Sequence, residues 1–141
     1  MTDTPAFDDQ GRYVAVTSGV TVRVQPVFLP RQSDPDNSQY FWAYEITIEN
    51  GGDNTVKLLN RYWHITDGNG RVEEVRGAGV VGKQPVLESG QSFSYASGCP
   101  LTTPSGIMVG HFEMVADSGE RFLVDVPAFS LDLPHGGQRP N

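Results

Sequence analysis

The stretch Tyr40-Phe41-Trp42-Ala43-Tyr44-Glu45-Ile46-Thr47-Ile48-Glu49 decides the fold class of this chain. Large apolar side chains at positions 40, 42, 44, 46 and 48 fall on one face of an extended backbone, and Ala43, Glu45, Thr47 and Glu49 fall on the other. Aromatic and β-branched residues with a period of two are typical of a strand that is buried on one side. The stretch therefore predicts an amphipathic strand packed on a core.

Similar alternation continues on both sides of this stretch. Val20, Val22 and Val24 alternate with polar residues, and we expect further strands over residues 71–76, 92–97, 107–116 and 121–131. Residues 53–67 are ambiguous, because Val56, Leu59 and Trp63 have helical spacing. The β-favouring residues before Asp67 instead favour a strand with an irregularity near Leu59-Asn60, and we adopt that interpretation.

Two turn signals join these strands. Asp67-Gly68-Asn69-Gly70 contains both Asp-Gly and Asn-Gly, which predicts a primed hairpin turn with positive φ. Asp117-Ser118-Gly119 predicts a slightly longer hairpin loop. We therefore predict an all-β protein, an antiparallel β-sandwich of about seven strands in one domain over residues 12–133. Residues 1–11 and 134–141 are polar and lack periodicity, so we expect disordered tails there.

Composition excludes several classes of function. Of the 141 residues, 17 are acidic and 10 are basic, and the net charge of −7 disfavours binding to nucleic acid or to anionic membranes. No apolar run is long enough for membrane insertion. The single cysteine, Cys99, has no partner for an internal disulfide, and the acidic N-terminus does not resemble a signal peptide. We expect a cytoplasmic protein in which Cys99 is a small, partly buried filler.

The glycine-rich segment Gly77-Ala78-Gly79-Val80-Val81-Gly82 matches the dinucleotide-binding pattern G-x-G-x-x-G. Pro85 follows where the phosphate-binding helix would run, so we reject that interpretation. Two alternatives stay open. The segment is either a tight crossover loop or a small anion site, in which Gly77, Gly79 and Gly82 would expose amides beside the cations Arg61, Arg76 and Lys83.

Other motifs support neither catalysis nor a metal centre. The loop at Asp34 lacks the central glycine of a calcium-binding loop, and Glu73 and Glu74 point to opposite faces of a strand. His64 and His111 have no second ligand at metal spacing, so we predict a structural, hydrogen-bonded role for His111. We predict no catalytic residue, no bound metal and no cofactor.

Several segments together resemble one known family. They are the segment Ser33 to Asn37, Arg61-Tyr62-Trp63, Asp67-Gly68-Asn69-Gly70, Gly77 to Pro85, Tyr95-Ala96-Ser97-Gly98, Gly110-His111-Phe112-Glu113-Met114 and Val126-Pro127-Ala128-Phe129. In this order and spacing they resemble the bacterial ApaG family from about Tyr13 to Leu133. The resemblance implies an immunoglobulin-like, fibronectin type III-like sandwich without established enzymatic activity. It also implies a genetic association with cobalt resistance and magnesium efflux, and places Trp63 between the two sheets.

Two functional hypotheses follow. The first is a non-enzymatic, cytoplasmic protein-interaction module with an unidentified protein partner, linked to cobalt and magnesium homeostasis through the resemblance. The alternative is a sensor that binds a small phosphate-containing ligand, a di- or polyphosphate, at residues 77–82. Its candidate residues are Arg61, Arg76, Gly77, Gly79, Gly82 and Lys83.

Overall fold

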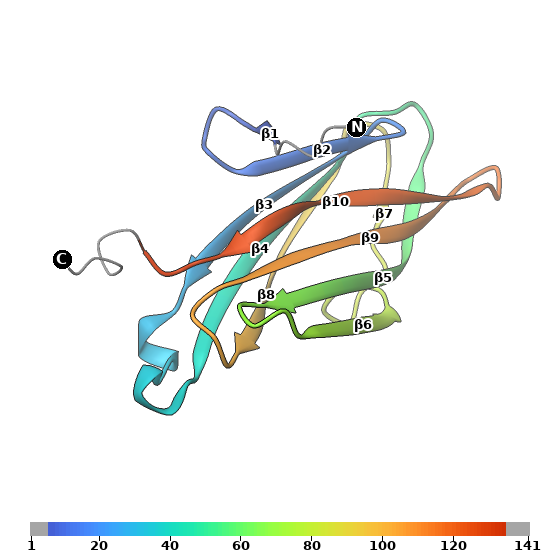
Figure 1. Ribbon diagram of the computed structural model, residues 1–141. Helices are drawn as coiled ribbons and strands as arrows, with labels where there is room; N and C mark the ends of the chain where they lie inside the picture. Colours follow the sequence, from blue (N-terminus) through green and yellow to red (C-terminus); the bar gives the residue numbers. More distant parts are fainter. Residues whose placement is uncertain (1–5, 135–141) are drawn as a thin grey trace.

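The structure is a computed structural model that describes residues 6–134. Two antiparallel sheets face each other across one core, which confirms the predicted β-sandwich (Figure 1). Sheet I has the spatial order β1 (Ala6–Phe7), β2 (Tyr13–Thr17), β3 (Val20–Phe28), β4 (Tyr40–Asn50) and β8 (Ser92–Leu101). Sheet II has the order β10 (Arg121–Leu131), β9 (Gly106–Ala116), β5 (Val56–Asp67) and β6 (Val72–Ala78), and β7 (Val86–Leu87) pairs with β5. Two short 3₁₀ helices, η1 (Pro30–Gln32) and η2 (Pro35–Asn37), connect β3 to β4.

The core lies between the sheets and follows the predicted alternation. In β4 every even-numbered residue from Trp42 to Asn50 is buried, and the odd-numbered residues are more exposed. Trp63 of sheet II is 3% exposed, and its ring centroid lies 5.5 Å from that of Tyr44 in sheet I. Trp63 therefore packs between the sheets, as predicted.

Strand β5 contains the predicted irregularity. Leu58 pairs with Met114 and Asn60 pairs with Glu113, so Leu59 is one extra residue opposite β9. A β-bulge of this kind bends a strand, and the alternation of buried residues moves from even positions before it to odd positions after it. The helical spacing in this segment therefore arises from a bulged strand.

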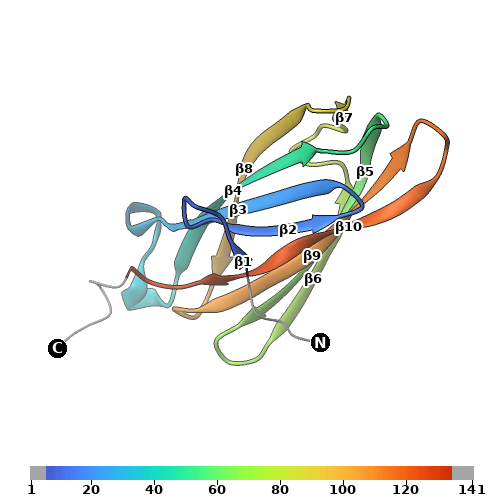
Figure 2. The ribbon, with the colours of Figure 1, turned by 90° about the horizontal axis from the view of Figure 1, so that it is seen from above.

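The described chain has more strands than the seven or so predicted. The main strands match the predicted segments, although β8 continues four residues beyond Ser97 to Leu101. Strand β2 was not predicted, because none of its side chains is fully buried and they show no clear alternation. Its residues lie beside β10 of the opposite sheet, as Figure 2 shows from above. Strands β1 and β7 have two residues each, too short for a periodic pattern.

The prediction of a disordered tail over residues 1–11 is wrong for residues 6–11. Ala6 pairs with Val14 as part of β1, and the Asp8 carboxylate accepts a hydrogen bond from Arg12 Nε at 2.8 Å. The same carboxylate lies 3.4 Å from Nε of Arg23 on β3. A local charge pair and two β-bridges thus hold a segment whose composition alone is typical of a tail. Residues 1–5 and 135–141 of the predicted tails lie outside the described residues.

The turn after Asp67 also differs from the prediction. Only Gly70 of its three loop residues has a positive φ, +84°, so the central Gly68 and Asn69 do not form a primed turn. The Asp67 carboxylate accepts hydrogen bonds from the amides of Asn69 and Arg71, at 2.8 and 3.0 Å. These bonds favour an ordinary turn closed by a left-handed glycine, the usual three-residue hairpin loop.

Candidate functional site

The glycine-rich segment forms a tight hairpin between β6 and β7. The amide of Val80 donates to the carbonyl of Lys83 at 2.8 Å, and the amide of Lys83 donates back at 2.9 Å. The two residues between them, Val81 and Gly82, have φ of +44° and +79°. A two-residue loop with two positive φ values is a primed turn, so the turn type predicted for residues 67–70 occurs here instead.

Gly79 is required by the geometry of this hairpin. Its φ is +65°, and a Cβ atom on it would lie 2.2 Å from the carbonyl oxygen of Lys83. Its amide donates to the carbonyl of Leu59 at 2.8 Å. The amides of Gly79, Val80 and Lys83 are thus already bonded inside the chain, which limits how many the loop can offer to an anion.

Arg61 fastens the end of β6 to β5. Its Nη1 donates to the carbonyls of Ala78 and Gly79, at 3.1 and 3.0 Å. The guanidinium crosses the position that a side chain would take at Gly77, because a Cβ there would lie 2.8 Å from Nη1. Arg61 and Gly77 therefore act together in holding the start of the hairpin.

Arg76 lies on the outward face of sheet II. Its guanidinium carbon is 4.7 Å from the centroid of the Tyr62 ring, and that ring stacks on His111 with centroids 4.9 Å apart. Among residues 6–134 the contact found for the His111 ring is this stacking, and the predicted side-chain hydrogen bond to another residue is not found. The Tyr62 hydroxyl donates to Glu74, which raises the pKa of Tyr62 and lowers that of Glu74.

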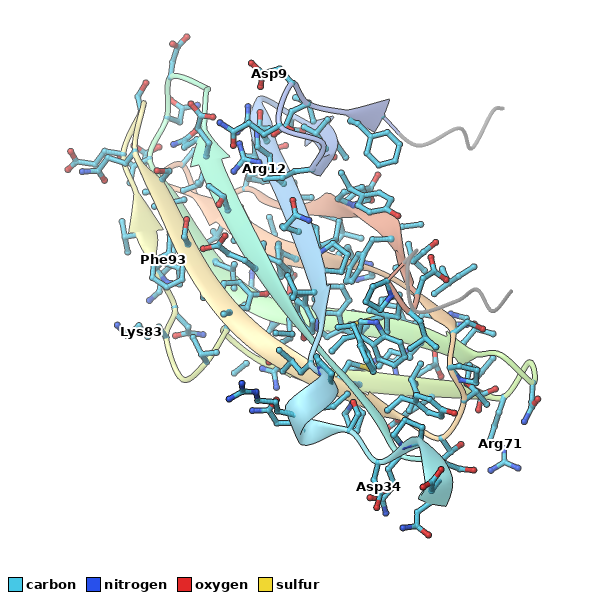
Figure 3. The ribbon with its side chains drawn as sticks, turned by 90° about the vertical axis from the view of Figure 1, so that its left-hand side faces the viewer. Asp9, Arg12, Asp34, Arg71, Lys83 and Phe93 are labelled. Carbon is cyan, nitrogen blue, oxygen red and sulfur yellow. The ribbon has the colours of Figure 1, made fainter. Side chains whose placement is uncertain are left out.

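The structure brings together only some of the six predicted residues. Arg61, Arg76 and Gly77 line one shallow hollow of about 570 Å³, together with Tyr62 and His111. Gly79, Gly82 and Lys83 lie on the neighbouring hairpin and do not line this hollow. Figure 3 shows Lys83 at the side of the molecule, beside the segment that leads to β8.

A different feature stands out when the free edges of the two sheets are compared. Edge strand β1 has two residues, and β6 is short and carries three charged side chains, Glu73, Glu74 and Arg76. Edge strand β10 contains a bulge between Val126 and Phe129 and is covered by β2, since the amide of Asp125 donates to the Thr17 hydroxyl. Short length, charge, bulges and covering segments all prevent an edge from pairing with another chain.

Strand β8 has little of this protection. It is ten residues long, Ser-Phe-Ser-Tyr-Ala-Ser-Gly-Cys-Pro-Leu, without a charged side chain. Its register with β4 is continuous from Glu49–Ser92 to Tyr40–Leu101, and among the described strands it pairs with β4 alone. Pro100, near its end, is its one residue that discourages pairing. β8 is thus the long, regular edge of the sandwich.

The register shows which backbone groups of β8 face the free side. Asn50 donates its amide to the carbonyl of Gln91 at 2.9 Å, so the even-numbered residues of β4 bond toward β8. The amides that point away from β4 then belong to alternate exposed residues of β8, namely Ser92, Ser94, Ala96 and Gly98. Pro100 belongs to the same alternate set of residues. Because an amide at this position would point away from β4, the missing N–H of proline removes no hydrogen bond between β8 and β4.

Two hollows flank the second half of β8. One, of about 760 Å³, is lined by apolar side chains such as Phe41, Ile65 and Leu101, and also by the charged side chains of Asp67, Arg71 and Glu73. A smaller one, of about 220 Å³, lies between β8 and β6 and is lined by Cys99 and Val75 among others. Cys99 is 4% exposed, and burial raises the pKa of its thiol to about 11. The cysteine therefore fills space, as predicted.

The comparisons with known proteins identify the family. The family model of the ApaG domain matches residues 30–116. The chain is 61% identical to Protein ApaG of Mesorhizobium japonicum and 59% identical to Protein ApaG of Brucella anthropi, over 122 residues in each case. Each match covers 86% of this chain and 94% of the relative. The chain belongs to the ApaG domain family.

Solved structures agree with this ApaG assignment. A crystal structure of the putative ApaA protein from Bordetella pertussis is 47% identical, with a TM-score of 0.81 over 82% of this chain and 94% of that one. A second X-ray structure, a structural-genomics target, is 38% identical with a TM-score of 0.80 and covers 90% of this chain. The resemblance that the sequence suggested is therefore confirmed at the level of family and fold.

The ApaG model match runs from η1 to the end of β9 and so includes both the glycine-rich hairpin and β8. In the part of the chain that the structure describes, no helix is long and apolar enough to cross a bilayer. Over the same residues, no three His, Cys, Asp or Glu side chains gather in a way that would hold a metal ion.

Sequence reasoning missed the free edge of the ApaG sandwich. A signal for it was present, because residues 92–101 form an extended run without any charge in a chain that is 19% charged. Such a run is equally typical of a central strand, however, and only the order of strands in the sheet shows that β8 is an edge.

Proposed function

We propose that this ApaG-family protein is a non-enzymatic interaction module that binds an extended segment of a partner protein along β8. The observation that carries the proposal is the ten-residue, uncharged and regular edge of sheet I, in a sandwich whose other edges are short, charged, bulged or covered. Pairing with an exposed sheet edge is a common mode of peptide recognition, in which backbone hydrogen bonds supply the affinity.

The test compares two substitutions at one position. Ala96→Pro removes an amide donor from the free side of β8 and leaves the bonds to β4 in place, whereas Ala96→Val keeps the donor. Each protein is used to capture partners from cytosol, and retained proteins are identified by mass spectrometry. We expect a stoichiometric partner with wild type and Ala96→Val, and its loss with Ala96→Pro. Equal retention by all three folded proteins would contradict binding at β8.

The same variants test the link to cobalt and magnesium homeostasis, which the family resemblance implies. We propose that the module acts there through its partner. A deletion strain grown under cobalt stress should be rescued by the wild-type gene and by Ala96→Val, and should not be rescued by Ala96→Pro. Normal growth of the deletion strain under this stress would remove the support for this role.

A second candidate function rests on the hollow that Arg61, Arg76 and Gly77 line together. Two guanidinium groups at one surface favour a small di- or polyphosphate. Titration with pyrophosphate and with diadenosine tetraphosphate, followed by amide NMR, should first shift the signals of Gly77 and the neighbouring loop. Unchanged spectra at millimolar ligand would refute phosphate binding. Arg76→Gln is the informative variant, because Arg61 also holds the hairpin.

A further inference from the structure

The outward face of sheet I beside β8 is lined by small side chains and then by acidic ones. Ser94 and Ala96 of β8 lie nearest the free edge, and in the register of the sheet they sit opposite Thr47 and Glu45 of β4. A strand added to β8 would lie about 10 Å from β4, which is two strand spacings. Because Ala96 is only a methyl group, a long side chain on the added strand can extend over it toward Glu45.

Glu45 is the acidic group available at this place. The other outward carboxylate of β4, Glu49, is already paired, since Arg23 Nη1 donates to its Oε1 at 2.9 Å. Glu45 is exposed, and its neighbour on β3 is the uncharged Gln25. No ion pair to Glu45 is found among residues 6–134. A cation above Ala96 would therefore meet an uncompensated carboxylate, in a chain with a net charge of −7.

The opposite side of an added strand would meet largely apolar surface. Its inward side chains would lie beside the two hollows between β8 and β6, where Ile65, Leu101 and Val75 supply apolar surface and Glu73 lines both hollows. Successive side chains of a strand point to opposite faces. A segment that suits both sides of β8 therefore alternates apolar residues with long basic ones.

We infer that the partner segment bound at β8 is an extended peptide of alternating apolar and basic residues, with a Lys or Arg that reaches Glu45. This inference rests on the proposed function and specifies its partner. A second copy of the chain fits less well, because its β8 has no basic residue and would bring a second Glu45 to the same sheet. The charge of the site therefore favours a basic peptide over self-association.

The experiment uses the full chain and two synthetic heptapeptides, one that alternates Val with Lys and one that alternates Val with Glu. Binding is measured by fluorescence anisotropy, and the contact surface by amide hydrogen exchange. We expect the Lys peptide to bind more tightly, and to protect the amides of Ser92, Ser94, Ala96 and Gly98. The alternate amides of β8, which already bond to β4, should change little.

Variants of Glu45 test the charge contact. Glu45→Gln should weaken the binding of the Lys peptide about two- to five-fold, as expected for the loss of an exposed ion pair. Glu45→Lys should reverse the preference, so that the Glu peptide binds more tightly than the Lys peptide. Glu120→Gln, in the loop between β9 and β10, is the matched control, because it makes the same change in net charge and should leave the preference unchanged. Raising the salt concentration should reduce the preference.

Different outcomes separate the inference from the proposed function. Equal protection of β8 by both peptides would overturn the basic partner and leave an edge-binding module in place. Without peptide, protection of the β8 amides that increases with protein concentration, together with dimers in sedimentation, would show that a second copy is the occupant. That result would also overturn the inference. Absence of β8 protection by the Lys peptide would overturn it as well, while capture with Ala96→Pro and Ala96→Val tests the module independently.

Discussion

Replacing Trp63 by alanine tests the core of this sandwich most directly. The indole lies between the sheets with 3% of its surface exposed. Its centroid is 5.5 Å from the ring of Tyr44, 6.0 Å from Phe129 and 6.4 Å from Phe112, and all three pairs meet edge to face. Because rigid strands of both sheets surround the site, the core cannot collapse into the space that the substitution leaves.

The expected loss follows from this packing. A buried Trp→Ala substitution costs about 3–5 kcal/mol, and the three edge-to-face contacts place Trp63→Ala in the upper half of that range. An unfolding entropy of about 2.1 cal/mol/K per residue gives about 0.3 kcal/mol/K for 141 residues. The melting temperature should therefore fall by roughly 13–17 °C.

Thermal melts followed by circular dichroism measure this change, and urea unfolding gives the free energy. His64→Ala is the matched control, because His64 is the next residue of β5 and points to the opposite, outward face. We expect the control to lie within about 0.5 kcal/mol of wild type. If Trp63→Ala melts like wild type while binding to the partner is lost, Trp63 is a contact residue and the assignment to the core is wrong.

Three further predictions concern the hairpins and the buried thiol. Gly79→Ala should lower the free energy of unfolding by more than Gly82→Ala, because a Cβ on Gly79 would meet the Lys83 carbonyl. A Cβ on Gly82 has open space, so Gly82→Ala should cost about 1 kcal/mol through its positive φ alone. Urea unfolding of both variants checks this, and equal losses would refute it. Asp67→Ala should cost about 1–2 kcal/mol through loss of its two amide bonds, and an unchanged urea midpoint would count against that role. Burial raises the Cys99 pKa from 9.0 to about 11, so the stability that the neutral thiol provides is complete below pH 9 and is lost as the pH rises to 11. Cys99→Ala should lose less stability than wild type over that interval, and equal losses in denaturation at pH 8, 9 and 10 would contradict the shift.

Local patterns in the sequence were sufficient for most of the strands. Alternation in β4 and β3 predicted which residues are buried, because the period of a strand is fixed by its backbone and does not depend on its neighbours. The bulge at Leu59 was also foreseen, since the pattern of buried residues changes phase there. Most of the strands, the sandwich and the burial of Trp63 were thus predictable from sequence, the last with help from the family resemblance.

The turns depended on contacts that lie outside the local pattern. Asp67 directs its carboxylate to two amides of its own loop, and this overrides the preference of Asn-Gly for a primed turn. The primed turn forms instead at Val81-Gly82, where the bonds of Gly79 to Leu59 and of Arg61 to the hairpin hold the chain. Turn type was therefore decided by hydrogen bonds to other strands and to nearby side chains.

The sequence by itself determined the family, through its motifs, and most of the strands with the faces that they bury, through residue type and a period of two. Only the tertiary structure decided which strand lies at an edge, and so it alone revealed β8 as a candidate binding surface. It also decided that Arg61 and Arg76 meet at one hollow while Lys83 does not line it. The physical reason is that edges and hollows depend on how distant segments pair. An uncharged strand has the same sequence pattern whether it lies in the middle of a sheet or at its edge.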